Sequence, residues 1–254
     1  MDMLTLEGVS AQIAGVAVLR GITANFQAGD TIVIVGRNGA GKTTLLRLVM
    51  GFMPKHGGRV SLEGRDLDAA PARDRARLGI GYAPEERIMF PSFSVEGNLR
   101  FPCEVIGMAR PAVNQRLAET LSIVPELEPL LSRSGAALSG GQGKMAALGR
   151  AIMAGRRMVL LDEPFQGLAP VLAQQYAQSL RRLHAARPQL CIVITESNRS
   201  LLKDIPTRTL VLERGEIQTD EDGHREGTGL MTSRTTSRWP VPGKPPGRPA
   251  PSGR

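Results

Sequence analysis

The sequence predicts an α/β fold built on a largely parallel sheet, with a small antiparallel β subdomain and an inserted helical subdomain. Three features of the 254-residue chain point to it. Short apolar runs rich in β-branched residues alternate with amphipathic helical stretches, a pattern typical of parallel sheets. Segments near the N-terminus instead have the turns typical of antiparallel strands. A long middle segment has helical stretches punctuated by prolines and no strong strand run.

The parallel strands are expected at apolar runs that share a high content of Val, Ile and Leu and end at turn residues or acids. These runs are residues 31–35, 158–161, 190–195 and 209–212. Amphipathic helical patterns at 43–51 and 172–186 follow the first run and precede the third. The alternation of the two patterns favours a parallel core, because parallel strands need long crossover connections.

The remaining segments predict the other parts of a single domain over residues 1–226. Residues 1–28 and 60–68 are expected to form the small antiparallel sheet. Residues 88–153 contain five prolines between helical stretches and are expected to form the helical subdomain.

Residues 227–254 predict a basic, disordered tail rich in Pro, Gly and Arg. Such a segment has too few apolar side chains to offset its ordering entropy. It carries five basic residues and no acid, so more than half of the net charge of +8 belongs to it. The charge therefore gives no strong reason to expect a nucleic-acid partner. Contact of the tail with a membrane surface or a partner is the alternative to a solvated tail.

The sequence also indicates the cellular compartment in which the protein is expected. No run of about 18 apolar residues is present, so no membrane span is expected. The first residues lack the pattern of a signal peptide. The two cysteines, Cys103 and Cys191, lie in unrelated contexts, and we expect neither a disulfide nor a metal framework. A cytoplasmic protein is the expectation.

The segment 36–43, GRNGAGKT, has the spacing of a phosphate-binding loop. Its glycines let successive backbone N–H groups point at phosphate oxygens, and the following helix directs its positive end there. Lys42 would contact the β- and γ-phosphates, and the Thr43 hydroxyl would ligate Mg²⁺. A chance glycine turn is the alternative, which the strand before the loop and the helix after it disfavour.

Two acidic residues follow the apolar run 158–161. Asp162 is expected to hold the magnesium shell, and Glu163 to orient and activate the attacking water as general base. Taken alone, such a pair is as often a solvated turn.

A third motif, LSGGQ at 138–142, precedes a helical stretch that begins near Lys144. A serine and two glycines at a helix start form an anion-binding surface, so the chain carries two phosphate-binding surfaces. A Ser-Gly-Gly linker is the alternative for this motif in isolation.

Together the three motifs resemble the nucleotide-binding domains of the ABC ATPases, over about residues 3–220. The resemblance implies a P-loop NTPase fold, ATP and Mg²⁺ as cofactors, and a dimer with a second ABC ATPase subunit. In such a dimer Ser139 and Gly141 would contact the γ-phosphate bound by the partner. The resemblance further implies residues in cofactor binding: Gly36, Arg37, Asn38, Gly39, Ala40, Gly41, Lys42, Thr43, Thr44, Glu85, Ser139, Gly140, Gly141, Gln142 and Ser197.

A narrower resemblance is to the second ATPase subunit of branched-chain amino acid importers. It rests on GIGYAPEERIMFPSFSVEGNL at 79–99, GLAP at 167–170 and TESN at 195–198. Urea importer ATPases look similar as well. This implies membrane permeases as partners, a substrate-binding protein indirectly, and a peripheral position on the cytoplasmic face of the plasma membrane.

The sequence departs from the general family pattern at the γ-phosphate. Glu85 stands where a glutamine usually links the nucleotide to the membrane subunit, and its carboxylate could ligate magnesium. Ser197 stands at the switch-histidine position, where it could hydrogen-bond the phosphate without carrying positive charge.

Two further departures concern the base and the partner subunit. Ile13 or Gln12 stands where an aromatic residue stacks on adenine. Gln166 and Ala169 replace a serine and an aspartate, and Ala169 cannot make cross-dimer hydrogen bonds. We therefore expect slow but real ATP hydrolysis.

Other functions remain open at this point. One is a weakly hydrolysing regulatory ATP-binding subunit. Another is a soluble ABC ATPase acting on nucleic acid, which the 97 positions between Lys42 and Ser139 disfavour because they leave no room for a very long coiled coil.

Overall fold

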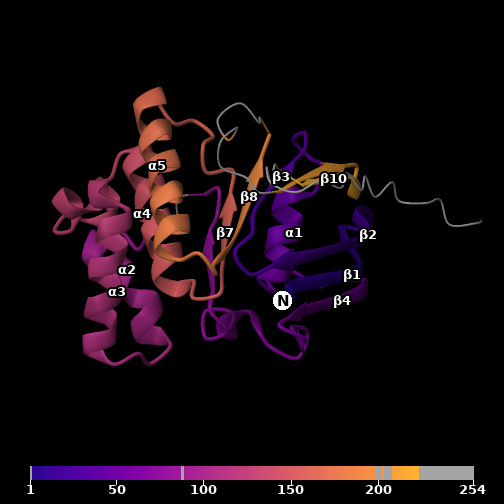
Figure 1. Ribbon diagram of the computed structural model, residues 1–254, viewed down its shortest axis with the longest axis horizontal. Helices are drawn as coiled ribbons and strands as arrows, with labels where there is room; N and C mark the ends of the chain where they lie inside the picture. Colours follow the sequence, from indigo (N-terminus) through magenta and orange to yellow (C-terminus); the bar gives the residue numbers. More distant parts are fainter. Residues whose placement is uncertain (1, 87–88, 198–201, 203–207, 223–254) are drawn as a thin grey trace, which may run out of the picture. The chain divides into compact units, whose positions relative to one another are not determined.

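A computed structural model describes residues 2–86, 89–197, 202 and 208–222, and it confirms the α/β fold (Figure 1). The main sheet has the strand order β10-β9-β3-β8-β7-β6. Its strands are β3 (Thr31–Val35), β6 (Ile80–Ala83), β7 (Met158–Asp162), β8 (Cys191–Glu196), β9 (Arg208–Glu213) and β10 (Glu216–Asp222). The pairs β9–β3, β3–β8, β8–β7 and β7–β6 are parallel, and β10 is antiparallel to β9. The four predicted apolar runs form β3, β7, β8 and β9, while β6 was not predicted.

A second sheet is antiparallel, with the order β2-β1-β4-β5. Its strands are β1 (Asp2–Ile13), β2 (Val16–Gln27), β4 (Gly57–Leu62) and β5 (Arg65–Asp66). The expected hairpin at 60–68 is confirmed as the β4–β5 pair. The expected short strands at 1–28 are wrong in length, because β1 and β2 each run for 12 residues. Register shifts at four points along this pair interrupt the alternation that would mark one long strand.

The helices are α1 (Lys42–Val49), α2 (Val95–Val105), α3 (Arg110–Ile123), α4 (Gly140–Ala154) and α5 (Pro170–Ala186). Within the described residues, three 3₁₀ segments accompany them: η1 (Ala72–Asp74), η2 (Pro125–Leu130) and η3 (Gly135–Ala137). The segment 88–153 therefore contains α2, α3, η2, η3 and most of α4. Its separateness as a subdomain stays a prediction, because α4 also packs against the main sheet. A Cβ on Gly81 of β6 would lie 2.0 Å from the Ala151 carbonyl oxygen of α4.

The main sheet separates two apolar cores, and alternate strand residues enter each of them. Ile32 and Ile34 of β3 pack with α1 and the antiparallel sheet, whereas Val33 packs with the helices of the other face. Figure 1 shows α2 to α5 on one side of β7 and β8, and α1 with β1, β2 and β4 on the other. Burial on both faces explains why the parallel strands read as continuous apolar runs.

The predicted tail, residues 227–254, lies outside the described residues. None of the helices in the described part of the chain is both long and apolar enough to cross a membrane.

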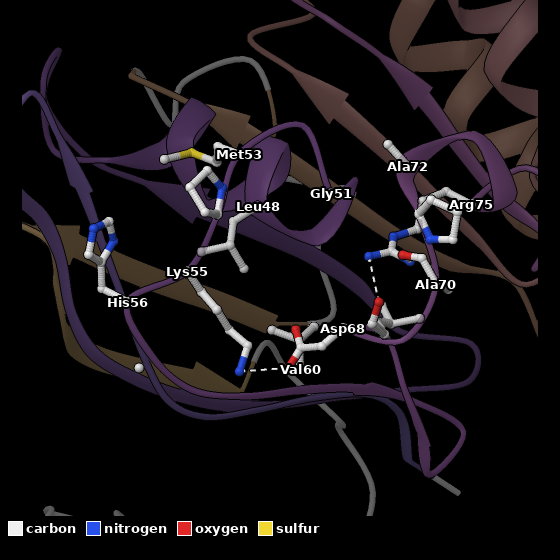
Figure 2. Close-up of a pocket in the computed structure, with 14 residues that line it drawn as sticks. Leu48, Gly51, Met53, Lys55, His56, Val60, Asp68, Ala70, Ala72 and Arg75 are labelled. Carbon is white, nitrogen blue, oxygen red and sulfur yellow. Dashed lines mark hydrogen bonds and ion pairs between the residues drawn. The ribbon is translucent and has the colours of Figure 1, made fainter.

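Arg75 connects the end of α1 to the loop that follows β5. Its guanidinium donates to the carbonyl oxygens of Val49 (2.9 Å), Ala70 (2.8 Å) and Leu67 (2.9 Å). Burial lowers the pKa of Arg75, and the nearby Asp68 opposes this. Arg75 borders a cavity with a volume of about 570 Å³. Lys55 and Asp68 also line this cavity (Figure 2) and form an ion pair at 2.6 Å. Arg75 thus holds the C-terminal end of the helix that carries the phosphate loop at its other end.

Replacing Arg75 by alanine is expected to lower the free energy of unfolding by about 3 kcal/mol, because three buried carbonyls lose their charged donor. Urea denaturation of the purified chain measures this. Arg73→Ala removes an exposed arginine two positions away and serves as the control. Equal stability of the two variants would contradict the role of Arg75.

Candidate functional site

The phosphate-loop segment 36–43 joins the end of β3 to the start of α1. Gly36 has no room for a side chain, since a Cβ there would lie 2.3 Å from the Leu212 carbonyl oxygen. Gly39 and Gly41 have φ angles of 82° and 106°, in the region that favours glycine. Gly41 is the N-cap of α1 and makes no side-chain capping bond. The first turn of α1 therefore presents free backbone N–H groups, which fits an anionic ligand.

Lys42 folds back over this loop and is buried. Its ammonium group donates to the carbonyl oxygens of Gly36 (2.7 Å) and Arg37 (3.2 Å) and to the Ser197 hydroxyl (3.1 Å). It also forms an ion pair with Glu163, with 2.9 Å between Nζ and Oε1. Lys42 thus contacts both the residue that follows β7, Glu163, and the residue that follows β8, Ser197.

Asp162 lies at the end of β7 and accepts three hydrogen bonds. Its Oδ1 accepts from the hydroxyls of Thr43 (3.1 Å) and Thr195 (2.7 Å), and its Oδ2 accepts from the Tyr82 hydroxyl (3.3 Å). Burial, and next the charge of Asp162, raise the pKa of Tyr82, so that its hydroxyl keeps its proton. The Thr43 hydroxyl and the Asp162 carboxylate are hard oxygen donors side by side, a chemistry that fits magnesium.

Glu163 has a left-handed backbone with a φ of 45°, which non-glycine residues rarely adopt. Its N–H donates to the backbone oxygen and to the hydroxyl of Thr195, each at 3.1 Å. Its carboxylate accepts from Ser197 at 2.8 Å besides the ion pair with Lys42. The turn after β7 therefore directs this carboxylate toward the phosphate loop.

Ser197 directly follows β8 and is exposed, and the structure brings it to the predicted site. Its oxygen lies 2.9 Å from Oδ1 of Asn38 and 2.8 Å from Oε1 of Glu163. A hydroxyl has one proton, so it donates to one of these oxygens at a time. Ser197 therefore connects the phosphate loop to the general-base candidate.

The LSGGQ motif forms the start of α4, which begins at Gly140, four residues before the expected start. Ser139 is the N-cap: its hydroxyl accepts from the N–H of Gln142 at 3.4 Å, and the Gln142 side chain accepts from the N–H of Ser139 at 3.0 Å. A Cβ on Gly141 would lie 2.2 Å from Leu172 Cδ1. In the described part of the chain, no hydrogen bond or ion pair joins this turn to residues 36–43. The two predicted phosphate-binding surfaces are therefore separate in one chain.

Glu85 follows β6 and is exposed. No hydrogen bond or ion pair connects it to Thr43, Asp162 or any other described residue, whereas its neighbour Glu86 lies 3.6 Å from Arg47. Among the described residues there is also no group of three or more His, Cys, Asp or Glu side chains that could hold a metal ion. The structure thus does not bring Glu85 to the magnesium candidates, and its role stays a prediction.

Ile13 and Ala169 are the other two departures from the family pattern that the structure places. Ile13 ends β1 with 52% of its surface exposed, so it presents an apolar face without an aromatic ring. Ala169 is the N-cap of α5 and makes no side-chain capping bond. The roles of both residues toward a ligand or partner stay predictions.

Four residues at the site were not singled out from the sequence: Tyr82, Lys144, Thr195 and Glu196. Glu196 is buried and its Oε1 accepts from the N–H of Phe165 at 2.9 Å. Burial raises the pKa of Glu196 to about 7. Lys144 donates to the backbone oxygen of Glu163 at 2.6 Å. The polar residues that end the apolar run at 190–195 are a signal that could have found Thr195 and Glu196.

Comparisons with known proteins agree with this arrangement. A protein-family model described as ABC transporter matches residues 19–166. The high-affinity branched-chain amino acid transport ATP-binding protein BraG of Pseudomonas aeruginosa is 29% identical, covering 91% of this chain and 96% of that protein. The lipopolysaccharide export system ATP-binding protein LptB of Acidithiobacillus ferridurans is 31% identical, covering 80% and 83%. The Fe(3+) ions import ATP-binding protein FbpC of Pseudomonas fluorescens is 36% identical over 80% of this chain, but over only 56% of its own length. The names of these proteins differ in cargo and agree in ATP binding.

Solved structures are similar over most of the chain. The ADP conformation of an ATP-binding cassette of an ABC transporter has a TM-score of 0.76 and 26% identity, covering 88% of this chain and 92% of that one. A dimeric bacterial ABC transporter cassette has a TM-score of 0.76 at 20% identity, covering 87% and 98%, and supports the fold alone.

Thr195→Val is expected to lower the free energy of unfolding by about 2 kcal/mol, because Asp162 loses a donor and the Glu163 N–H loses a buried acceptor. Thr195→Ser keeps the hydroxyl and is the matched control, expected near the wild-type value. Thermal or urea unfolding compares the three proteins. A valine variant as stable as the serine variant would show that these bonds contribute nothing.

Proposed function

Because the chain belongs to the ABC transporter family, as an ATP-binding and hydrolysing subunit, we propose that it energises an importer through ATP turnover at the phosphate loop and the end of β7. One observation carries the assignment of the site. Lys42 and Thr43 of the phosphate loop contact Glu163 and Asp162, respectively, at 2.9 and 3.1 Å. Two segments 119 positions apart in sequence thereby supply the charges that phosphoryl transfer requires.

The loop would bind the phosphates of ATP through its backbone N–H groups and the Lys42 ammonium. Bound magnesium would offset phosphate charge, with the Thr43 hydroxyl and the Asp162 carboxylate holding it, the latter directly or through water. Ile13 at the end of β1 would offer an apolar contact to the base, weaker than aromatic stacking.

Glu163 would accept the proton of the attacking water. Its carboxylate is paired with Lys42 and Ser197 in the structure. A γ-phosphate would compete for both donors, since it carries more charge than a carboxylate. ATP binding would therefore release Glu163 to face the water, and Ser197 would be free to hydrogen-bond the phosphate.

The LSGGQ turn would act on the nucleotide of a second subunit, identical to this chain or related to it. Ser139 lies at an exposed helix start, and among the described residues neither it nor Gly141 has a hydrogen bond or ion pair with the phosphate loop of its own chain. A head-to-tail dimer would place each turn against the partner's ATP. The Ala169 side chain would contribute no hydrogen bond to this interface.

Branched-chain amino acids are the cargo we propose for the transporter. The segments 79–99, 167–170 and 195–198 favour it, as does similarity to BraG across 96% of that protein's length. The alternatives are a urea or amide importer and a weakly hydrolysing regulatory subunit. The permease partners would hold the chain at the cytoplasmic face of the membrane.

Glu163→Gln is expected to lower kcat for ATP hydrolysis by about 100-fold or more while ATP binding is retained, because the amide cannot accept the proton. Phosphate release and binding of a fluorescent ATP analogue measure the two quantities on the full chain. Glu7→Gln changes an exposed acid of β1 and is the control. Wild-type protein that binds ATP but turns over no faster than Glu163→Gln would support the regulatory alternative instead.

The cargo is tested in the host by deleting the gene and measuring uptake of labelled leucine and of labelled urea. Loss of leucine uptake alone is expected, restored by the wild-type gene and not by Glu163→Gln, because transport depends on turnover. Loss of urea uptake with normal leucine uptake would replace the proposed cargo by urea.

A further inference from the structure

Helix α4 starts at the LSGGQ turn, and its buried Lys144 contacts the turn that follows β7. Lys144 is 8% exposed, and its ammonium group donates to the backbone oxygen of Glu163 at 2.6 Å. Lysine is rarely buried to this extent, because its charge must be satisfied by oxygen atoms in the interior. The contact therefore marks a specific role rather than packing of an apolar stem.

The contact is made to the backbone of a residue in an unusual conformation. Glu163 has a φ of 45°, a region that L-residues occupy only when their surroundings hold them there. Thr195 accepts from its N–H, and Lys144 donates to its C=O. The two sides of this residue's backbone are thus held by β8 and by α4.

The side chain of Glu163 is bound by a different set of groups, Lys42 and Ser197. A ligand that displaces the carboxylate from Lys42 leaves the backbone contact with Lys144 in place. The carboxylate can then turn about its side-chain torsions while the backbone stays in position, which limits where it can meet a water molecule.

The next residues of the turn are held in the same region. The buried Glu196 accepts from the N–H of Phe165, and the charge of Lys144 partly opposes the effect of burial on the pKa of Glu196. The charged groups that face this turn are Lys42, Lys144, Asp162, Glu163 and Glu196.

We propose that Lys144 is a positioning residue, which fixes the backbone of Glu163 and mechanically connects the LSGGQ turn to the general base of the same chain. Ser139 and Lys144 lie five positions apart on one continuous helix whose N-cap is closed by a capping box. A displacement of the turn by a nucleotide on the partner subunit is thereby carried to Glu163. In the proposed dimer, a nucleotide bound at one composite site would therefore affect the general base of the other site through α4. This inference rests on the proposed function for its consequence, but not for the contact itself.

The test compares full-length wild type, Lys144→Met and Lys144→Gln, with Lys55→Met as a matched control at the lysine beside Asp68. Amide hydrogen exchange of the segment 160–168 is measured without nucleotide. Lys144→Met, which has no donor, is expected to exchange at least about tenfold faster in this segment only, because local opening reports the lost backbone contact. Lys144→Gln retains a donor, but a neutral one with a shorter reach, and is expected to recover part of the protection.

The second arm separates positioning from general destabilisation. Lys144→Met is expected to lower kcat by at least about tenfold with ATP affinity unchanged, since a misplaced base affects the reaction and not binding. Lys144→Gln should again be intermediate, and Lys55→Met should match wild type in both arms.

Wild-type exchange and kcat in Lys144→Met would overturn the proposal, and so would faster exchange across the whole chain with weaker ATP binding. If wild type itself hydrolyses no ATP, the proposed function fails, and the exchange arm alone decides the role of Lys144. If Lys144→Met does not fold, Lys144→Arg takes its place. Its larger planar group cannot reproduce the 2.6 Å contact, so the same two changes are expected.

Discussion

The site depends on the in-register parallel pairing of β3, β8 and β7. Val35 of β3 pairs with Glu196 of β8, and Thr195 of β8 pairs with Asp162 of β7. The three strands therefore end at one level, and the turns that follow them lie at the same edge of the sheet. The phosphate loop leaves this edge from β3, and the acidic pair leaves it from β7. A slip of one residue in either pairing would turn Asp162 or Thr195 to the opposite face and separate Asp162 from Thr43.

Charged side chains are buried at the same edge of the sheet, at a large cost in desolvation free energy. Its buried ionisable side chains are Lys42, Lys144, Asp162, Glu163 and Glu196. Their burial is tolerated because each contacts a hydroxyl, a backbone group or an opposite charge, and because removing one member would leave its partner unpaired. Burial raises the pKa of Glu196 to about 7, because removal from water disfavours the charged carboxylate. Such a site suits a highly charged ligand, because phosphate and metal can replace the contacts that these protein groups make with one another.

Helix α4 begins at one of the two proposed phosphate-binding surfaces and contacts the turn that borders the other. Ser139 at its N-cap is exposed, Gly141 is half-buried beside Leu172, and Lys144 in the next turn contacts the residue that follows β7. Close packing fixes the path of the helix farther along, because Gly81 of β6 has no space for a Cβ against the Ala151 backbone of α4. A helix packed this tightly moves as a unit, so its exposed start and its buried Lys144 are mechanically one element.

The α/β class, four strands of the main sheet and the residues of the three motifs could be predicted from the sequence, because periodicity and glycine spacing are local properties. β6 could not, because its four residues, Ile80–Ala83, are too short to show a period. The length of β1 and β2 was hidden by register shifts in their pairing. Local pattern also predicted phosphate and metal chemistry at Lys42, Thr43, Asp162 and Glu163, whose side chains the structure brings together. Only the tertiary structure decided that Tyr82, Thr195 and Lys144 hold those residues in place and that Glu85 lies apart from them. The reason is that such contacts join strands and helices distant in sequence, and their geometry follows from strand order and register, which no local pattern encodes.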